Sequence, residues 1–140
     1  MLTLYEFIKI LNYSDTIKMD LHINPVLDIK YLNQVYGEDP SIIHLILDAF
    51  LSDSMPRWHS LKNALEDGNY EESASIVHGL KPSFTMAGLT AIRPKVEKLE
   101  TAIKGGVDVA ELKATYDRIS GELFPLIPII ESESSRLATL

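Results

Sequence analysis

The stretch YEESASIVHGLKPSFTMAG, residues 70–88, determines the fold. Its seam of apolar residues recurs at the three- and four-residue spacing of one helix face. The seam consists of Val77, Leu80, Phe84 and Ala87. Gly68 and Asn69 precede the stretch and Gly88 ends it, which is the punctuation expected at helix ends. We therefore predict a helix over residues 70–87 that buries one face.

Two further helices are predicted on the N-terminal side of this stretch. The first begins at Pro25 and ends at Gly37, since proline is favoured in the first turn and glycine just past the last. The second begins at Asp39-Pro40 and continues to Gly68 as one long helix. Pro56 lies inside it and has no amide hydrogen, so we expect a kink over residues 52–56 without a break.

Two more helices are predicted on the C-terminal side. One runs from residue 90 or 91 to Lys104 and ends at a glycine pair. The last begins at Asp108, which together with Glu111 resembles a capping box. Pro125 and Pro128 are expected to limit that helix.

The fold class that follows is all-α, an up-and-down four-helix bundle with an additional N-terminal helix or helices, because no useful stretch alternates as a strand would. Residues 1–24 are assigned to an N-terminal extension and residues 25–140 to the bundle. The extension is predicted to hold a short amphipathic helix. Its apolar residues are Leu4, Phe7, Ile8 and Leu11.

Composition restricts the possible partners and compartments. A chain of 140 residues suits one domain. Its net charge of -7 argues against general binding to nucleic acid or an anionic membrane. There is no cysteine, which excludes disulfides and thiolate chemistry and is compatible with the cytoplasm. Glu6 and Lys9 interrupt the first apolar stretch, so it lacks the core of a signal peptide.

His78 and Lys81 are the candidate functional pair. Residues three apart share one face of a helix, so Lys81 can reach a charged group attached to the ring of His78. Small or compact residues surround the histidine and leave it accessible; they are Ala74, Ser75, Gly79 and Pro82. His78, Lys81 and Thr85 point away from the apolar seam. The alternative is that His78 is an ordinary surface residue and that the small residues mark a helix crossing.

Other kinds of site have little support. His44 and His59 are fifteen residues apart in one helix, about 22 Å along its axis, and cannot chelate one ion. No metal ligand motif, hydrolase nucleophile motif or phosphate-binding loop occurs. Basic residues on the helix before Lys104 alternate with Glu97 and Glu100, which predicts a solvated face. Those basic residues are Arg93, Lys95 and Lys98.

The segment His78-Gly79-Leu80-Lys81, followed by Ser83 and Gly88, resembles the motif of histidine-containing phosphotransfer (HPt) domains of bacterial two-component phosphorelays. That motif reads His-x-Leu-Lys-Gly-Ser/Ala, with a glycine about ten residues after the histidine. Residues 36–40, 47–51 and 99–100 also resemble family segments, and the resemblance covers about residues 27–119. Pro82 stands where the family usually has glycine. It removes the amide that would bond the His78 carbonyl, so we expect the helix to bend or loosen there.

The resemblance implies that His78 accepts a phosphoryl group from one receiver aspartate and passes it to another, with Lys81 stabilising the phosphoryl charge. It implies response-regulator receiver domains and a hybrid sensor kinase as partners, and Mg²⁺ supplied by the receiver. The chain itself would have no cofactor, no metal and no kinase activity, and would act as a cytoplasmic monomer.

Two alternatives stay open. One is a helical adaptor of the same fold that binds receivers without carrying phosphate, which Pro82 favours. The other is a structural bundle that dimerises through its N-terminal helix.

Overall fold

The computed structural model describes residues 3, 4, 6 and 21–140, and within these residues the chain forms helices and no strand. This confirms the all-α fold class. The α-helices are α2 (Ile29–Tyr36), α3 (Pro40–Ala49), α4 (Met55–Glu66), α5 (Tyr70–Met86), α6 (Arg93–Lys104), α7 (Val109–Leu123) and α8 (Ile127–Leu137). No helix in the described part of the chain is both long and apolar enough to cross a lipid bilayer.

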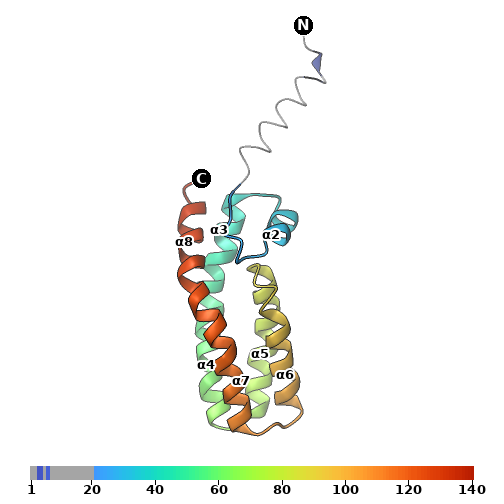
Figure 1. The fold of residues 1–140 in the computed structure, drawn as a ribbon, viewed down its shortest axis with the longest axis vertical. Coiled ribbons are helices and arrows are strands. Elements are labelled where there is room, and N and C mark those ends of the chain that lie inside the picture. The colour runs from blue at the N-terminus through green and yellow to red at the C-terminus, as the bar shows by residue number, and fades with distance from the viewer. Residues whose placement is uncertain (1–2, 5, 7–20) are drawn as a thin grey trace.

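Two long rods and two shorter helices form the bundle (Figure 1). Helices α3 and α4 are joined by a π-helical turn, η1 (Phe50–Ser54), and run as one rod. Helices α7 and α8 form the second rod, and α8 packs along α3. Helix α5 lies against α4 and α6, and α7 lies against α4 and α6. At the end of the bundle where α5 turns into α6, residues 21–39 fold over that turn.

The expected distortion near Pro56 takes the form of the π turn η1. The amide of Met55 bonds to the carbonyl of Phe50, five residues back, in place of the usual four. Pro56 then lies in the first turn of α4, where a missing amide hydrogen costs least. The rod therefore continues through the proline, as the sequence predicted.

The expectation that Pro125 and Pro128 limit the last helix is only partly right. Helix α7 does end at Leu123, but a short 3₁₀ turn, η2 (Phe124–Leu126), leads directly into α8. Pro128 lies in the first turn of α8, a position that suits its fixed φ and lack of a donor. The proline therefore starts a helix here, and α8 completes the long rod.

The core of the bundle is centred on Trp58, which is fully buried. Its ring stacks on Tyr116 at a centroid distance of 4.8 Å and meets Phe84 edge-on at 5.8 Å. The indole Nε1–H donates to Ser120 Oγ at 3.0 Å, which satisfies the polar edge of the ring. These contacts join α4, α5 and α7 and fix the rotation of α5.

Two residues before the boundary at residue 25 that the sequence suggested contribute to the core of the bundle. Leu21 and Ile23 are buried in the core. Helix α2 starts at Ile29, not at Pro25, because Asp28 is its N-cap and accepts a bond from the Tyr31 amide. The amphipathic helix predicted from Leu4, Phe7, Ile8 and Leu11 falls, apart from Leu4, outside the described residues and stays a prediction.

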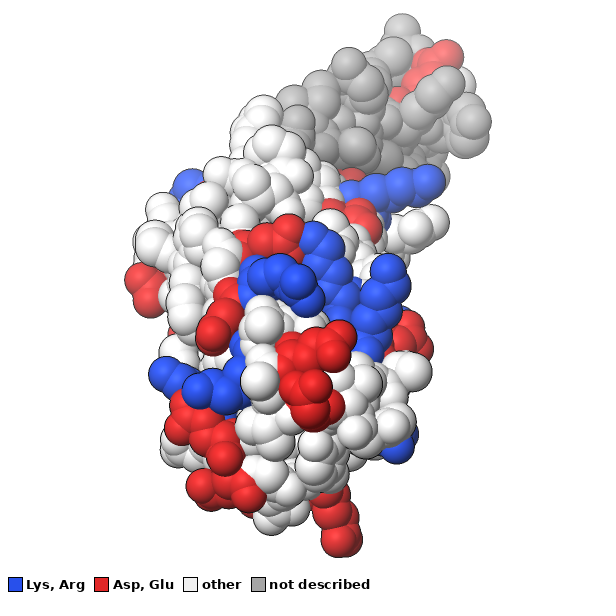
Figure 2. All heavy atoms as spheres, turned by 60° about the horizontal axis from the view of Figure 1, so that its bottom comes forward, with Lys and Arg blue, Asp and Glu red and all other residues white. Residues whose placement is uncertain are grey.

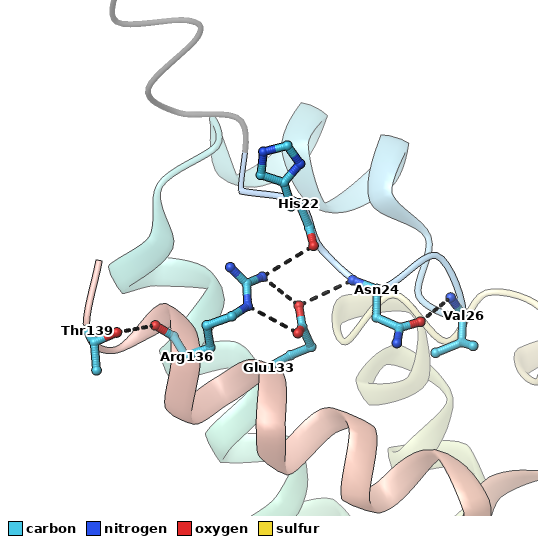
Figure 3. Close-up of polar contacts among 6 residues, drawn as sticks. All are labelled: His22, Asn24, Val26, Glu133, Arg136 and Thr139. Atoms are coloured by element: carbon cyan, nitrogen blue, oxygen red, sulfur yellow. Dashed lines mark hydrogen bonds and ion pairs between the residues drawn. The ribbon is translucent and has the colours of Figure 1, made fainter.

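A polar cluster ties the incoming chain to α8 (Figure 3). Glu133 accepts a hydrogen bond from the Asn24 amide at 3.2 Å and pairs with Arg136 at 2.7 Å. Arg136 in turn donates to the carbonyl of His22 at 3.5 Å. Residues 22–24 are thereby anchored to the C-terminal rod.

Positive and negative side chains lie close together on the surface. Figure 2 shows Lys and Arg side chains gathered near the middle of one face, with Asp and Glu side chains beside and below them. In the groove between α6 and α7, Lys95 pairs with Glu122. Lys95, Glu97 and Lys98 are exposed, as the sequence predicted for this helix. Arg93 is instead half-buried, and its Nε is buried without a hydrogen-bond partner in the described structure.

Gly88 fits the turn between α5 and α6 closely against α2. Its φ is +77°, and its carbonyl accepts a bond from the Asp28 amide at 2.8 Å. A Cβ at this position would lie 3.0 Å from Cδ1 of Leu32, which is itself fully buried. Gly106 has a similar φ of +74°, but a Cβ there would meet open space.

We predict that Gly88→Ala destabilises the bundle more than Gly106→Ala does. Both changes impose a left-handed conformation on alanine, which costs about 1 to 2 kcal/mol. Only Gly88→Ala also pushes on Leu32, so we expect about 1 kcal/mol more from overpacking. Urea unfolding followed by circular dichroism measures both, and equal losses would show that α2 is not packed on this turn as described.

Candidate functional site

His78 lies in the middle of α5, directly beside the buried seam. Val77 and Leu80 are fully buried, whereas the His78 side chain is 72% exposed. The prediction that the histidine points away from the seam into solvent is therefore confirmed. Ser75 and Pro82, about one turn before and after His78, are also exposed.

A buried glutamate on α6 holds one nitrogen of the ring. Glu100 Oε2 lies 3.1 Å from His78 Nδ1, and the Glu100 side chain is only 7% exposed. Its other oxygen, Oε1, lies 2.8 Å from the ammonium of Lys81. The two residues of the sequence-predicted pair therefore meet at one carboxylate.

Neighbouring positive groups keep Glu100 ionised in spite of its burial. Burial alone would raise the pKa of this carboxyl. The hydrogen bond and charge of Lys81 lower it, as do the charge of Lys104 and the hydrogen bond to His78. The balance holds the pKa of Glu100 below its ordinary value of 4.5. The carboxylate is therefore negatively charged at neutral pH and accepts hydrogen bonds on both oxygens.

This contact fixes the chemical role of each imidazole nitrogen. An ionised carboxylate only accepts hydrogen bonds, so Nδ1 must donate its hydrogen to Glu100. In the neutral ring, Nε2 then carries the free lone pair. The exposed part of His78 thus presents a nucleophilic nitrogen whose partner nitrogen is locked by a negative charge.

Lys81 is more enclosed than the sequence suggested. Its side chain is 13% exposed, and its ammonium faces Glu100 and, at 4.0 Å, Glu97. Lys104 approaches Glu100 Oε2 at 3.7 Å from one turn further along α6. The positive charges of two lysines are therefore balanced by the negative charges of two glutamates beside His78.

The remaining predicted site residues are divided between the two sides of α5. Ala74 is partly buried against the core. Gly79 and Ser83 face α4, where the Arg57 guanidinium lies over Gly79 and lines a groove together with Ser83.

Two expectations for these positions need correction. Gly79 does not leave open space, because Arg57 fills it. The Thr85 hydroxyl oxygen is buried instead of pointing outward, and it has no hydrogen-bond partner in the described structure.

Pro82 does not interrupt the helix that carries the site. Helix α5 is continuous from Tyr70 to Met86 with Pro82 inside it. Because proline has no amide hydrogen, the His78 carbonyl lacks its usual helical partner. The site keeps its helical framework all the same, since His78 and Lys81 both reach Glu100 from the same face.

Sequence reasoning missed Glu100 and Arg57. Glu100 was expected on a solvated face, and that expectation is wrong. A signal was available, because Val96, Leu99 and Ile103 form the buried stripe of α6 and position 100 continues the same spacing. Arg57 gave no signal, since nothing in the sequence shows that it crosses to α5.

The other histidines do not join this site. His44 Nδ1 lies 2.9 Å from the Ser134 carbonyl and links α3 to α8. The His59 ring packs on Phe124. Among the residues the structure describes, no three His, Cys, Asp or Glu side chains are grouped so as to hold a metal ion.

A comparison with models of known families matches residues 45–123 to the Hpt domain. The match covers more than half of the chain and includes all of α4, α5, α6 and α7. The chain belongs to the Hpt domain family. Comparisons with curated proteins and with solved structures gave no match.

Family membership assigns the chain a phosphotransfer role in two-component systems. Hpt domains are helical phosphocarrier modules and not catalysts, and they interact with receiver domains. The matched range contains His78, Lys81 and Glu100, so the geometry described above lies within the Hpt domain.

We predict that Glu100→Gln lowers the stability of the bundle at pH 7. The change removes the negative charge facing Lys81, which is itself mostly buried, and we expect a loss of about 1 to 3 kcal/mol. Glu97→Gln is the matched control on the same helix, because the Glu97 side chain is 56% exposed and should cost about 0.5 kcal/mol or less. Urea unfolding of the three proteins makes the comparison.

The stability difference between the native protein and Glu100→Gln should depend on pH. The folded pKa of Glu100 lies below its unfolded value, so its contribution is fully present above about pH 4.5 and fades as the pH falls through the folded value. The difference between the native protein and Glu100→Gln should therefore shrink below about pH 4.5. A difference that stays constant down to pH 3 would contradict the ionised, stabilising role of this carboxylate.

Proposed function

We propose that the chain carries a phosphoryl group on Nε2 of His78, shuttling it between the aspartates of two receiver domains in a phosphorelay. The observation that supports this is the exposed imidazole whose Nδ1 is held by the buried carboxylate of Glu100. A relay histidine must be reachable by a partner and must present one defined nitrogen. Both conditions are met at His78.

Phosphoryl transfer to Nε2 of His78 requires no proton to leave the site. The lone pair of Nε2 attacks the phosphorus of an aspartyl phosphate, a P–N bond forms, and the P–O bond breaks with its electron pair going to the aspartate. The ring becomes positively charged while Nδ1–H remains bonded to Glu100. The carboxylate offsets that charge, and the reverse step hands the phosphoryl group to the next aspartate.

Lys81 is proposed to stabilise the phosphoryl oxygens. Its ammonium is one turn from His78 and already borders the site through Glu100. In this scheme Mg²⁺ and the catalytic aspartates belong to the receiver, and the chain supplies no cofactor of its own. We further propose that it acts as a cytoplasmic monomer that receives its phosphoryl group from a hybrid sensor kinase. The absence of cysteine is compatible with that compartment.

The alternative of a phosphate-free adaptor is less well supported. Its main argument was that Pro82 would disturb the site, yet α5 is continuous through Pro82 and His78 stays hydrogen-bonded. An adaptor would also have no need for an exposed imidazole locked by a buried charge. We therefore favour the phosphocarrier.

We predict that His78→Gln abolishes phosphoryl uptake and that His59→Gln does not. His59 is a suitable control because it is also exposed and lies outside the site. Each protein is incubated with a phosphorylated receiver and Mg²⁺, and acid-labile, base-stable label is measured. Label that persists in His78→Gln would contradict the proposal. If the native protein binds the receiver but takes up no label, the adaptor is favoured instead.

We predict that Lys81→Ala slows transfer more than Lys104→Ala. Lys81 is enclosed beside His78, whereas Lys104 is 58% exposed and 3.7 Å from Glu100. Loss of a cation that meets the developing charge should reduce the transfer rate about tenfold to hundredfold. Stopped reactions at a fixed receiver concentration give the rates, and circular dichroism checks that both variants remain folded. Equal effects would show that Lys81 has no special access to the phosphoryl group.

A further inference from the structure

Arg57 approaches the site from the side opposite Glu100. It lies on the exposed side of α4, and its guanidinium rests over Gly79, the residue that directly follows His78. A Cβ built on Gly79 would lie 2.3 Å from Arg57 Nη2. The absence of a side chain at Gly79 is therefore what lets the arginine lie across α5 at this point.

Arg57 differs from the lysines near His78 in having no acidic partner. Lys81 and Lys104 both pair with Glu100. Arg57 forms no ion pair and no side-chain hydrogen bond within the described structure. Asp53, one turn earlier, lines the same groove without pairing with it. The guanidinium donors of Arg57 are thus available to a new anion.

A phosphoryl group on His78 would add about two negative charges that the site must compensate with positive groups. The positive charges of Lys81 and Lys104 are already balanced by Glu100 and Glu97. Lys81 can turn toward the phosphoryl group only by weakening its contact with a buried carboxylate. Arg57 faces no such competition.

We propose that Arg57 is a second phosphoryl-binding cation, which contacts the phosphoryl oxygens on Nε2 of His78 from the α4 side. This proposal rests on the phosphocarrier function of His78. The guanidinium fork can donate two hydrogen bonds to phosphoryl oxygens, whereas an ammonium acts as a single point of charge. The phosphoryl group is then flanked by Lys81 on the α6 side and Arg57 on the α4 side, and Gly79 serves to admit the arginine.

The first test uses Arg57→Gln, Arg57→Lys and the control Arg118→Gln. Arg118 lies on α7, which is diagonal to α5 in the bundle, and donates to Thr115 of its own helix. Its replacement changes the net charge by the same amount. His78 is phosphorylated chemically with phosphoramidate, so no receiver takes part, and the phosphorus resonance is followed against pH by NMR. The resonance that is missing in His78→Gln belongs to His78.

Arg57 should favour the doubly charged phosphoryl group and hold its second pKa low. Arg57→Gln should therefore raise that pKa and shorten the lifetime of the phosphohistidine about threefold to tenfold. Arg57→Lys should restore part of the effect, and Arg118→Gln should change neither quantity. An unchanged pKa in Arg57→Gln, or equal changes in Arg57→Gln and Arg118→Gln, would overturn the proposal.

Gly79→Ala provides a second, independent test. The added methyl must displace the Arg57 guanidinium, so this variant should raise the phosphoryl pKa in the native background. In the Arg57→Gln background it should have no further effect, because there is no guanidinium to displace. Additive effects would show that Gly79 does not act through Arg57 and would overturn this geometry.

The two proposals fail in different ways. If the native protein takes up no label from a phosphorylated receiver, the phosphocarrier function fails and the role of Arg57 fails with it. If His78 is phosphorylated but Arg57→Gln leaves its pKa and lifetime unchanged, only the role of Arg57 is overturned. Normal uptake from a receiver in the same variant would then show that the carrier function is intact.

Discussion

The carboxylate of Glu100 lies between α5 and α6, where burial would make its charge costly if nothing compensated it. That compensation comes from Lys81, Lys104 and His78. The carboxylate therefore joins α5 to α6 and also holds the imidazole of His78. It fixes the imidazole by one nitrogen and leaves the other in solvent. A single buried charge therefore links α5 to α6 and determines which imidazole nitrogen of His78 faces solvent.

The bundle provides the rigidity that such a contact needs. Trp58 packs between Tyr116 and Phe84 and joins three helices around its ring. Residues 21–39 close the end of the shorter α5–α6 pair, while the two long rods continue past it. With the rotation of α5 fixed in this way, His78 can stay exposed while its nearest sequence neighbours on the seam are buried. Exposure of the histidine is thus a consequence of core packing.

The prolines show how one residue type can serve different purposes. Pro56 and Pro128 both lie in the first turn of a helix, after a π turn and a 3₁₀ turn respectively. In each case the hydrogen bonds change just before the proline, because the Met55 amide donates to the Phe50 carbonyl and the Ile127 amide donates to the Phe124 carbonyl, and the rod continues. Pro82 has no such turn before it and lies inside α5. It frees a carbonyl at the candidate site without breaking the helix, which sets this chain apart from the usual glycine of the family motif.

The sequence alone determined the helices of the bundle, the buried seam of α5 and the pairing of His78 with Lys81, because all of these depend on local periodicity and on residues one turn apart. It did not determine that α8 extends the last rod, because a proline in the sequence predicts the end of a helix unless the backbone turn before it is known. Nor did it reveal that Glu100 is buried beside His78 or that Arg57 lies over Gly79. Those contacts join residues 22 positions apart in both cases, on different helices, and only the packing of α4, α5 and α6 brings them together.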